Sequence, residues 1–400
     1  VGPGPVVARL RVDNDATTDG VKSIWDTFGI IRGIELPDEL VIIGAHRDAW
    51  GPGAADNVSG TTSVIEAARA VMEEVKAGWR PRRTMIFATW DAEEWGIIGS
   101  TEYVEDDSLR LSRGAIAYLN QDVAAQGPRF GGGGSPSLRS LLRDVVKTVR
   151  YPGDTASVYS VWRKQTGVAD SLEPAMGDPG GGSDFAGFYN HLGIPHVEWG
   201  FGGQGGVYHS AYDSYWWMSR FGDPGFLRHT AAARIGTAMM MRLANAEVLP
   251  YDYVEFAKTM RRMVAPVDRA LERPRTGAST AALRDAIDAF GRSAMAFTEA
   301  RDAALAQPVQ REARNRANTA LLGVERALTR PSGLRTRPWF RNLIYASDED
   351  NGYATIAFPS VNEAIRSGDQ ALIHAEIADL AAHFRAAAAK LDEARAALGR

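Results

Sequence analysis

The chain has 400 residues, of which 45% are hydrophobic and 24% charged, and its formal net charge at pH 7 is −4. This usage is typical of a globular protein, and the dispersed charges exclude a nucleic-acid-binding face and a disordered acidic tail. Cysteine is absent, which excludes disulfides, zinc–thiolate sites and cysteine nucleophiles, so any metal must be bound by His, Asp and Glu.

The chain begins with Val1 rather than Met, and no signal-peptide pattern follows. We therefore expect a processed or truncated end. No run of about 18 apolar residues occurs, so no membrane span is expected in this chain.

The first half of the chain alternates short apolar runs with helical patterns. Residues 41–45, 84–90 and 115–119 have the composition of buried strands. Residues 60–77 lie between the first two runs, are rich in Ala and Glu, and predict a helix. Strand, helix and strand at this spacing predict an α/β fold with a mostly parallel sheet and helices on both faces.

The second half is rich in Ala and Arg and has few turn signals. Amphipathic helices are predicted over residues 253–271, 279–305, 309–328 and 369–398. Residues 331–359 interrupt them with Pro, Gly and aromatic residues. We predict two domains, residues 1–250 and 251–400, with Pro250 marking the boundary and the second domain helical.

Residues that can bind metals follow each predicted strand. His46 follows 41–45, Glu94 follows 84–90, and Asp122 follows 115–119. Because the carboxyl ends of parallel strands meet at one edge of a sheet, we expect these side chains to lie close together. Asp56 lies in a glycine-rich loop and His209 in a later loop, which completes a set of five candidate ligands.

An acidic residue after a strand is more often a helix cap or a solvated side chain, so no member of this set indicates a metal on its own. The adjacent carboxylates Glu93 and Glu94 favour a metal site, because they repel each other unless a cation or proton lies between them. Neighbouring side chains on a strand leave the backbone in different directions, so one can bind a metal while the other faces a water molecule as general base. Five ligands and a base suit two zinc ions bridged by a carboxylate and a water.

Five sequence blocks in this order resemble the M28 zinc peptidases. They are IGAHRD (43–48), DNVSG (56–60), WDAEEWG (90–96), NQD (120–122) and YHSAYD (208–213). The chain is most similar to the branch that contains glutamate carboxypeptidase II and the transferrin receptor, because RPWFRNLIY (337–345) and residues 352–359 resemble its C-terminal helical domain. The resemblance implies a zinc-exopeptidase fold, a helical dimerisation domain that forms a homodimer, and a peptide substrate.

The resemblance also implies which residues hold two zinc ions per chain. His46 and Asp122 would share one ion, Glu94 and His209 would share the other, and Asp56 would bridge them.

Three catalytic roles are implied in the same way. Glu93 would be the general base that acts on a metal-bound water and later protonates the leaving group. Asp48 would orient His46, and Tyr208 would donate a hydrogen bond to the developing oxyanion. A purely structural role is the alternative for Asp48 and Tyr208.

The residues with which the branch grips glutamate differ here. Glutamate carboxypeptidases place a lysine before the tyrosine that matches Tyr353, and this chain has Gly352. Glu198 stands in the branch's arginine patch, so preference for a C-terminal glutamate is not expected. Glu198 would repel acidic substrates or meet a substrate amine, or else it is a solvated loop carboxylate. The candidate substrate-binding residues are Gly182, Ser183, Glu198 and Tyr353.

A protease-associated domain lies upstream in the branch and is absent from this chain. Glu102 and Glu105 match half of a calcium site whose other half lies in that domain, although a solvated pair on one helix is the alternative.

Two other functions stay open: a receptor-like binding protein, against which the complete ligand set argues, and a zinc amidase or cyclase acting on N-terminal residues. The family is mostly extracytoplasmic, and we expect the same compartment here.

Overall fold

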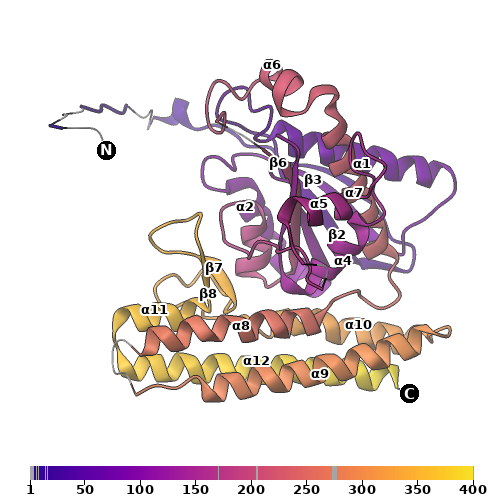
Figure 1. Ribbon diagram of the computed structural model, residues 1–400, viewed down its shortest axis with the longest axis vertical. Helices are drawn as coiled ribbons and strands as arrows, with labels where there is room; N and C mark the ends of the chain where they lie inside the picture. The colour runs from indigo at the N-terminus through magenta and orange to yellow at the C-terminus, as the bar shows by residue number, and fades with distance from the viewer. Residues whose placement is uncertain are drawn as a thin grey trace.

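The computed structural model describes residues 4–5, 7, 9–13, 15, 17–169, 171–203, 206–272 and 277–399. A central sheet flanked by helices forms one part, and a bundle of long helices from the second half of the chain lies below it in Figure 1. Across these described ranges, no helix is both long and apolar enough to cross a bilayer. The predicted combination of an α/β part and a helical part is confirmed.

The central sheet contains β1 (Thr27–Ile31), β2 (Leu36–His46), β3 (Arg83–Trp90), β4 (Ala115–Asn120), β5 (Arg129–Gly134) and β6 (His196–Gly202). Its strand order is β1-β3-β2-β4-β6-β5, with the four inner strands parallel and both edge strands antiparallel to their neighbours. The three strands predicted from the sequence are confirmed as β2, β3 and β4. Their apolar residues are almost all buried, as expected for inner strands that are covered on both faces.

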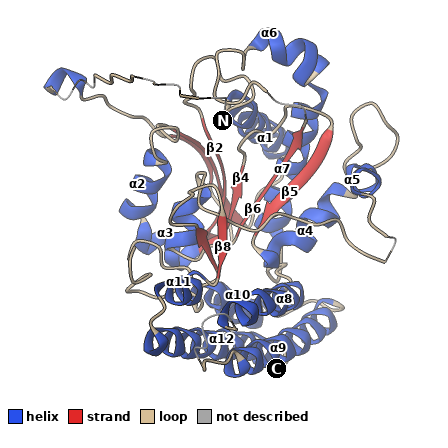
Figure 2. Cartoon of the chain, turned by 60° about the vertical axis from the view of Figure 1, so that its left-hand side comes forward, coloured by secondary structure: helices blue, strands red, loops and turns tan. Residues whose placement is uncertain are grey.

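Helices cover both faces of the sheet, as Figure 2 shows. One face carries α1 (Val58–Lys76), α4 (Pro136–Val146), α5 (Val158–Thr166) and α7 (Leu227–Asn245), and the other carries α2 (Ile98–Asp106) and α3 (Ser108–Gly114). Short helical turns fill the connections: η1 (Thr18–Gly20), η2 (Gly187–His191), α6 (Tyr215–Trp217), η3 (Met218–Gly222) and η4 (Pro224–Phe226). The helix predicted over 60–77 is confirmed as α1, which begins two residues earlier because the Asn57 side chain caps it by accepting from the N–H of Gly60.

The helical bundle consists of α8 (Tyr253–Leu271), α9 (Ala281–Leu305), α10 (Arg311–Arg326) and α12 (Gln370–Leu398), each within about two residues of its predicted bounds. The interrupting segment folds into β7 (Tyr345–Ser347), β8 (Thr355–Ala357) and α11 (Pro359–Ser367). Phe256, Phe290 and Phe384 meet in the bundle core, with ring centroids 5.6 and 6.0 Å apart.

Hydrogen bonds from the bundle and from the segment that leads into it hold the start of β4. Arg326 of α10 donates to the carbonyl of Ala115 at 2.5 Å, and the Tyr251 hydroxyl donates to the carbonyl of Ile116 at 2.5 Å. Residue 250 lies in the connection between α7 and α8. The bundle therefore packs against the end of the sheet opposite to the one that carries the candidate ligands.

Candidate active site

The candidate ligands are positioned by the carboxyl ends of three neighbouring parallel strands. His46 is the last residue of β2, Asp122 lies two residues beyond β4, and Glu94 lies four residues beyond β3. Asp56 comes from the loop between β2 and α1, and His209 from the loop that follows β6. The sequence-based expectation that these side chains meet at one edge of the sheet agrees with this arrangement.

The five side chains form two groups that share Asp56. His46, Asp56 and Asp122 make one group, and Asp56, Glu94 and His209 make the other; within each group the candidate ligand atoms lie within 4.8 Å of one another. One carboxylate oxygen of Asp56 is 3.2 Å from His46 Nε2, and the other is 3.1 Å from His209 Nε2. The two groups correspond to the two predicted pairs with Asp56 between them.

The chemistry of these groups fits divalent cations. Three carboxylates surround two imidazoles, so the cluster has an excess of negative charge unless cations balance it. Glu94 Oε2 lies 3.0 Å from His209 Nε2, while its Oε1 is buried and has no hydrogen-bond partner in the described part of the chain. A buried oxygen without a partner is costly, and a metal ion would satisfy it.

The loop that carries Asp56 is held by a residue to which the sequence assigned no role. The Asp213 carboxylate accepts hydrogen bonds from the N–H groups of Ala55, at 2.7 Å, and of Asp56, at 2.9 Å. Asp213 is 2% exposed, so these bonds are shielded from water. It ends the block 208–213 that carries the resemblance, and that was the only signal that could have identified it.

Glu93 and Glu94 lie in a turn, so the expectation that strand geometry separates their side chains is wrong. β3 ends at Trp90, and Ala92 has a positive φ of 57°, which stops the extended backbone before the two glutamates. The Asp48 carboxylate accepts from the N–H of Glu93 at 3.0 Å and from the N–H of Glu94 at 3.1 Å. The turn and Asp48 together determine where the two carboxylates lie.

Asp48 therefore contacts the turn of Glu93 and Glu94 as well as His46, the residue that it was expected to orient. Its Oδ1 lies 3.5 Å from His46 Nδ1, on the ring edge opposite the ligand atom Nε2. The same carboxylate bonds the turn of Glu93 and Glu94, so one side chain connects the ends of β2 and β3. This position suits a residue that orients a metal ligand and the general base at once.

We expect Asp48→Asn to lower kcat/KM by roughly 10–100-fold, because an amide can accept only one of the two backbone hydrogen bonds and leaves the turn loose. Steady-state kinetics, with metal content measured on the same samples, would check this. The exposed Asp38→Asn is the control. Asp48→Asn with unchanged kinetics would contradict a positioning role.

Glu93 lies beside the two ligand groups without belonging to either. Its Oε2 is 3.9 Å from His46 Nε2, and its side chain is 11% exposed. Burial raises the pKa of Glu93 to about 9, nearby His46 opposes this, and the Asp184 and Asp122 carboxylates add to it. Cations in the two groups would lower this pKa, because positive charge stabilises a carboxylate.

The second half of the chain contributes one wall of the site. The Tyr353 hydroxyl lies 3.2 Å from the Tyr208 hydroxyl, and the Tyr208 ring stacks on His209 with centroids 3.8 Å apart. A Cβ atom added to Gly182 would lie 3.3 Å from the Tyr353 ring, so glycine permits this close approach. Burial raises the pKa of Tyr208, which keeps its hydroxyl available as a donor.

The other two candidate substrate-binding residues, Ser183 and Glu198, are connected to the candidate ligand Asp122 by hydrogen bonds. Ser183 Oγ donates to Asp122 Oδ2 at 2.7 Å, and Asn120 Nδ2 is 3.0 Å from Ser183 Oγ and 3.3 Å from Glu198 Oε2. Glu198 lies on β6, with Asn120 of β4 as its register partner. Glu198 is therefore not a solvated loop carboxylate, and Asn120, for which the sequence predicted no role, connects it to the site.

Glu102 and Glu105 lie exposed on α2, and Glu105 Oε1 accepts a hydrogen bond from Trp339 Nε1 at 2.6 Å. Neither residue belongs to a potential metal group of the described residues. The half calcium site stays a prediction.

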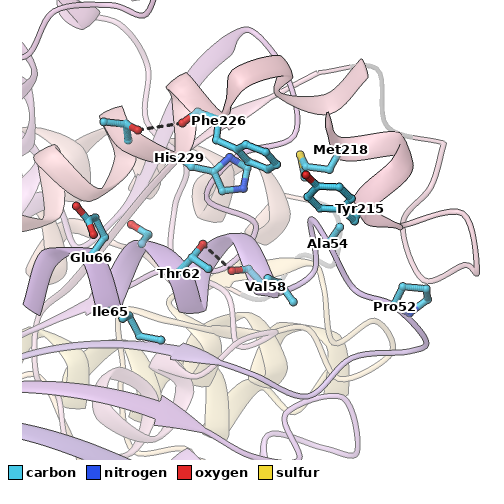
Figure 3. Close-up of a pocket in the computed structure, with 12 residues that line it drawn as sticks. Pro52, Ala54, Val58, Thr62, Ile65, Glu66, Tyr215, Met218, Phe226 and His229 are labelled. Carbon is cyan, nitrogen blue, oxygen red and sulfur yellow. Dashed lines mark hydrogen bonds between the residues drawn. The ribbon is translucent and has the colours of Figure 1, made fainter. Parts of the chain in front are cut away.

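A separate cavity of about 600 Å³ lies beside the loop that carries Asp56 (Figure 3). Its wall is formed by Pro52, Ala54, Val58, Thr62, Ser63, Ile65, Glu66, Tyr215, Met218, Phe226, His229 and Thr230. Most of these side chains are apolar, and His229 Nδ1 is bound to Asp223 at 2.8 Å. None of the five candidate ligands lines this cavity, so it is distinct from the two metal groups.

Comparison with known proteins gives two matches that together cover most of the chain. Residues 28–221 match the model of peptidase family M28, and residues 278–392 match the transferrin receptor-like dimerisation domain. A probable glutamate carboxypeptidase of Arabidopsis thaliana is 38% identical over 367 residues, which cover 91% of this chain and 52% of that protein. A probable glutamate carboxypeptidase of Zea mays is 37% identical over 370 residues, covering 91% and 50%.

Aminopeptidase NAALADL1 of Mus musculus is 34% identical over 260 residues, which cover 62% of this chain and 35% of that protein. The chain spans about half the length of the two plant relatives. Relatives with both kinds of name, carboxypeptidase and aminopeptidase, are therefore similar to this chain.

Proposed function

Because the chain belongs to peptidase family M28, with a transferrin receptor-like dimerisation domain after the peptidase domain, we propose that it is a di-zinc metallo-exopeptidase that hydrolyses terminal bonds of short peptides. The observation that supports this most directly is the pair of ligand groups that share Asp56. His46 and Asp122 would hold one ion, and Glu94 and His209 the other. An all-nitrogen and oxygen donor set with two imidazoles suits zinc.

When bound, a zinc pair polarises the scissile carbonyl and makes water a stronger nucleophile at neutral pH. The protein groups supply the proton transfers and the positioning. Glu93 Oε2 takes a proton from the attacking water and later gives it to the nitrogen of the leaving amine as the C–N bond breaks. Asp48 positions the turn of Glu93, and the Tyr208 hydroxyl donates to the oxygen of the tetrahedral intermediate.

A digest of mixed tripeptides with zinc-reconstituted protein, monitored by mass spectrometry, tests this function. The expected result is stepwise loss of single residues from one end. Intact peptides after complete metal loading, or internal cleavage alone, would contradict an exopeptidase. Loss of ammonia or water from the intact peptide would support the amidase or cyclase alternative instead.

We further propose that the helical bundle forms a homodimer, on the basis of the match to the dimerisation domain over residues 278–392. Most soluble homo-oligomers are two-fold dimers in which the same surface meets itself. A groove between α8 and α9 has an apolar part formed by Val254, Ala257, Ile287, Gly291 and Met295, of which Met295 is 50% exposed. Lys258, Arg261, Asp288 and Arg292 form the charged part of its lining.

Light scattering at micromolar concentration should give twice the chain mass of 43.3 kDa. Met295→Glu should shift this mass towards the monomer, because it places a charge on the apolar part of the groove. Glu312→Gln, on an exposed side chain of α10, is the matched control. A wild-type mass of a single chain would contradict the dimer.

A further inference from the structure

We propose that the Glu198 carboxylate binds the free α-ammonium group of the peptide substrate, so that the enzyme removes residues from the amino-terminal end. This inference rests on the exopeptidase function proposed above and specifies the end of the peptide on which it acts. Four features of the described residues support it. They are the position of Glu198, its lack of a cationic partner among them, the glycines beside it, and the absence from the described site of a cation for a substrate carboxylate.

The position of Glu198 connects it to the metal groups. Two hydrogen-bonded residues, Ser183 and Asn120, separate its carboxylate from the candidate ligand Asp122. Asn120 is the register partner of Glu198 on the neighbouring parallel strand, and both strands end at the edge that carries the ligands. The α-ammonium of an amino-terminal residue lies one carbon from the scissile carbonyl, so a binding group for it must lie this close to the reacting centre.

Within the part of the chain that the structure describes, the Glu198 carboxylate has no cation among its partners. Asn120 Nδ2 is the one hydrogen-bond donor to it within the described ranges, and its Oε1 receives none. Burial raises the pKa of Glu198 to about 7, the bond from Asn120 opposes this, and the Asp122 carboxylate adds to it. Glu198 is half-buried. Withdrawing a carboxylate even partly from water is unfavourable unless a positive charge compensates, and a substrate ammonium group would supply that charge.

Glycines of the neighbouring strand pack against the Glu198 carboxylate. The facing strand β5 contains Gly131–Gly134, and a Cβ atom added to Gly133 would lie 2.9 Å from Glu198 Oε1. A larger residue at Gly133 would displace the end of the Glu198 side chain, so the glycine permits the carboxylate to lie where it does. Arg139, which bonds the carbonyl of Gly134 behind this strand, has its charge balanced by Asp178 at 2.6 Å.

Among the described residues, the candidate ligands and substrate-binding residues have no cationic partner that could bind a substrate carboxylate. In the described part of the chain, no Lys or Arg forms an ion pair or hydrogen bond with the candidate ligands, Glu93, Ser183, Glu198, Tyr208 or Tyr353. Residue 352 is a glycine, and open space surrounds the position where its Cβ would lie. A substrate carboxylate would therefore meet carboxylates rather than a guanidinium or ammonium group, which disfavours it.

The test compares L-leucine 4-nitroanilide with its N-acetyl form, using zinc-reconstituted wild-type protein and Glu198→Gln. We expect wild-type protein to favour the free amine in kcat/KM by at least about thirtyfold, and Glu198→Gln to lose most of this ratio while keeping its zinc content. Glutamine retains the shape of the side chain and can keep a contact with Asn120, so we expect Glu198→Gln to fold as the wild-type protein does. Glu312→Gln should leave the ratio as it is in wild-type protein.

A second measurement does not depend on turnover. L-Leucinamide should bind metal-free wild-type protein more tightly than N-acetyl-L-leucinamide does, and Glu198→Gln should remove the difference in isothermal calorimetry. N-acetyl-L-lysine 4-nitroanilide separates the two sources of an ammonium group, since full activity on it would show that Glu198 recognises a side chain and would overturn the proposal.

The outcomes also separate this proposal from the function on which it rests. If N-acetylated peptides with a free C-terminus are cleaved and a free amine gives no advantage, the exopeptidase stands and the role of Glu198 is wrong. If zinc-loaded protein cleaves none of these substrates, the exopeptidase function itself fails.

Discussion

Glu93→Gln should lower kcat by at least about a hundredfold, which is the usual contribution of a general acid–base, and leave the metal content at two ions per chain. Glu93 belongs to neither ligand group, and its Oε2 lies 3.9 Å from His46 Nε2. Glutamine preserves the shape of the side chain and the backbone bond to Asp48, but it cannot carry the proton. Single-turnover kinetics and elemental analysis on the same preparation measure the two quantities.

Glu94→Gln is the informative comparison, because the two glutamates are adjacent and share the support of Asp48. Glu94 Oε2 faces His209 Nε2 at 3.0 Å and its Oε1 lacks a partner, so this substitution should lower metal occupancy, and excess zinc should restore part of the activity. Glu73→Gln, on an exposed side chain of α1, serves as the control. Loss of zinc from Glu93→Gln with retention by Glu94→Gln would reverse the two roles.

Asp56→Asn should have the largest effect on metal content, because Asp56 is the one residue that both ligand groups contain. We expect the stoichiometry to fall from two ions per chain to one or fewer. Activity should fall by more than about a hundredfold, since even changes to the residues that support a metal ligand cost 10–100-fold. Elemental analysis after zinc reconstitution and removal of free metal measures the stoichiometry.

Thermal unfolding provides a second readout for Asp56→Asn. A ligand at 100 times its Kd contributes about 2.7 kcal/mol to stability, so a chelator should lower the Tm of wild-type protein and change that of Asp56→Asn less. Asp223→Asn is the matched control, because Asp223 is a fully buried carboxylate that bonds His229 and lies outside both ligand groups. A wild-type stoichiometry near zero would falsify the metal centre itself.

The elements that position the site follow from local patterns in the sequence. Strands β2, β3 and β4 are continuous apolar runs, and such runs mark inner strands of a parallel sheet because both of their faces are covered. The parallel sheet then brings residues just beyond β2, β3 and β4 to one edge, which is why His46, Glu94 and Asp122 could be predicted to meet. The four long helices were predicted nearly to the residue, because amphipathic periodicity is also a local property.

The contacts that refine the site depend on packing between segments far apart in the chain, about which local periodicity carries no information. Asp213 holds the loop of Asp56 across more than 150 residues, and Tyr353 of the second half meets Tyr208 of the first. Glu93 and Glu94 lie in a turn whose shape depends on Asp48 from another strand end.

Glu198 shows most clearly the difference between what the local sequence predicts and what tertiary packing decides. The sequence left open whether its carboxylate was solvated, repelled acidic substrates or met an amine. Its pairing with Asn120 depends on the register of β6 against β4, and its burial depends on the glycine strand β5 on its other side. This pairing and partial burial arise only when the sheet assembles. The free energy of the charged carboxylate then depends on the neighbouring charges and on how much water still reaches it.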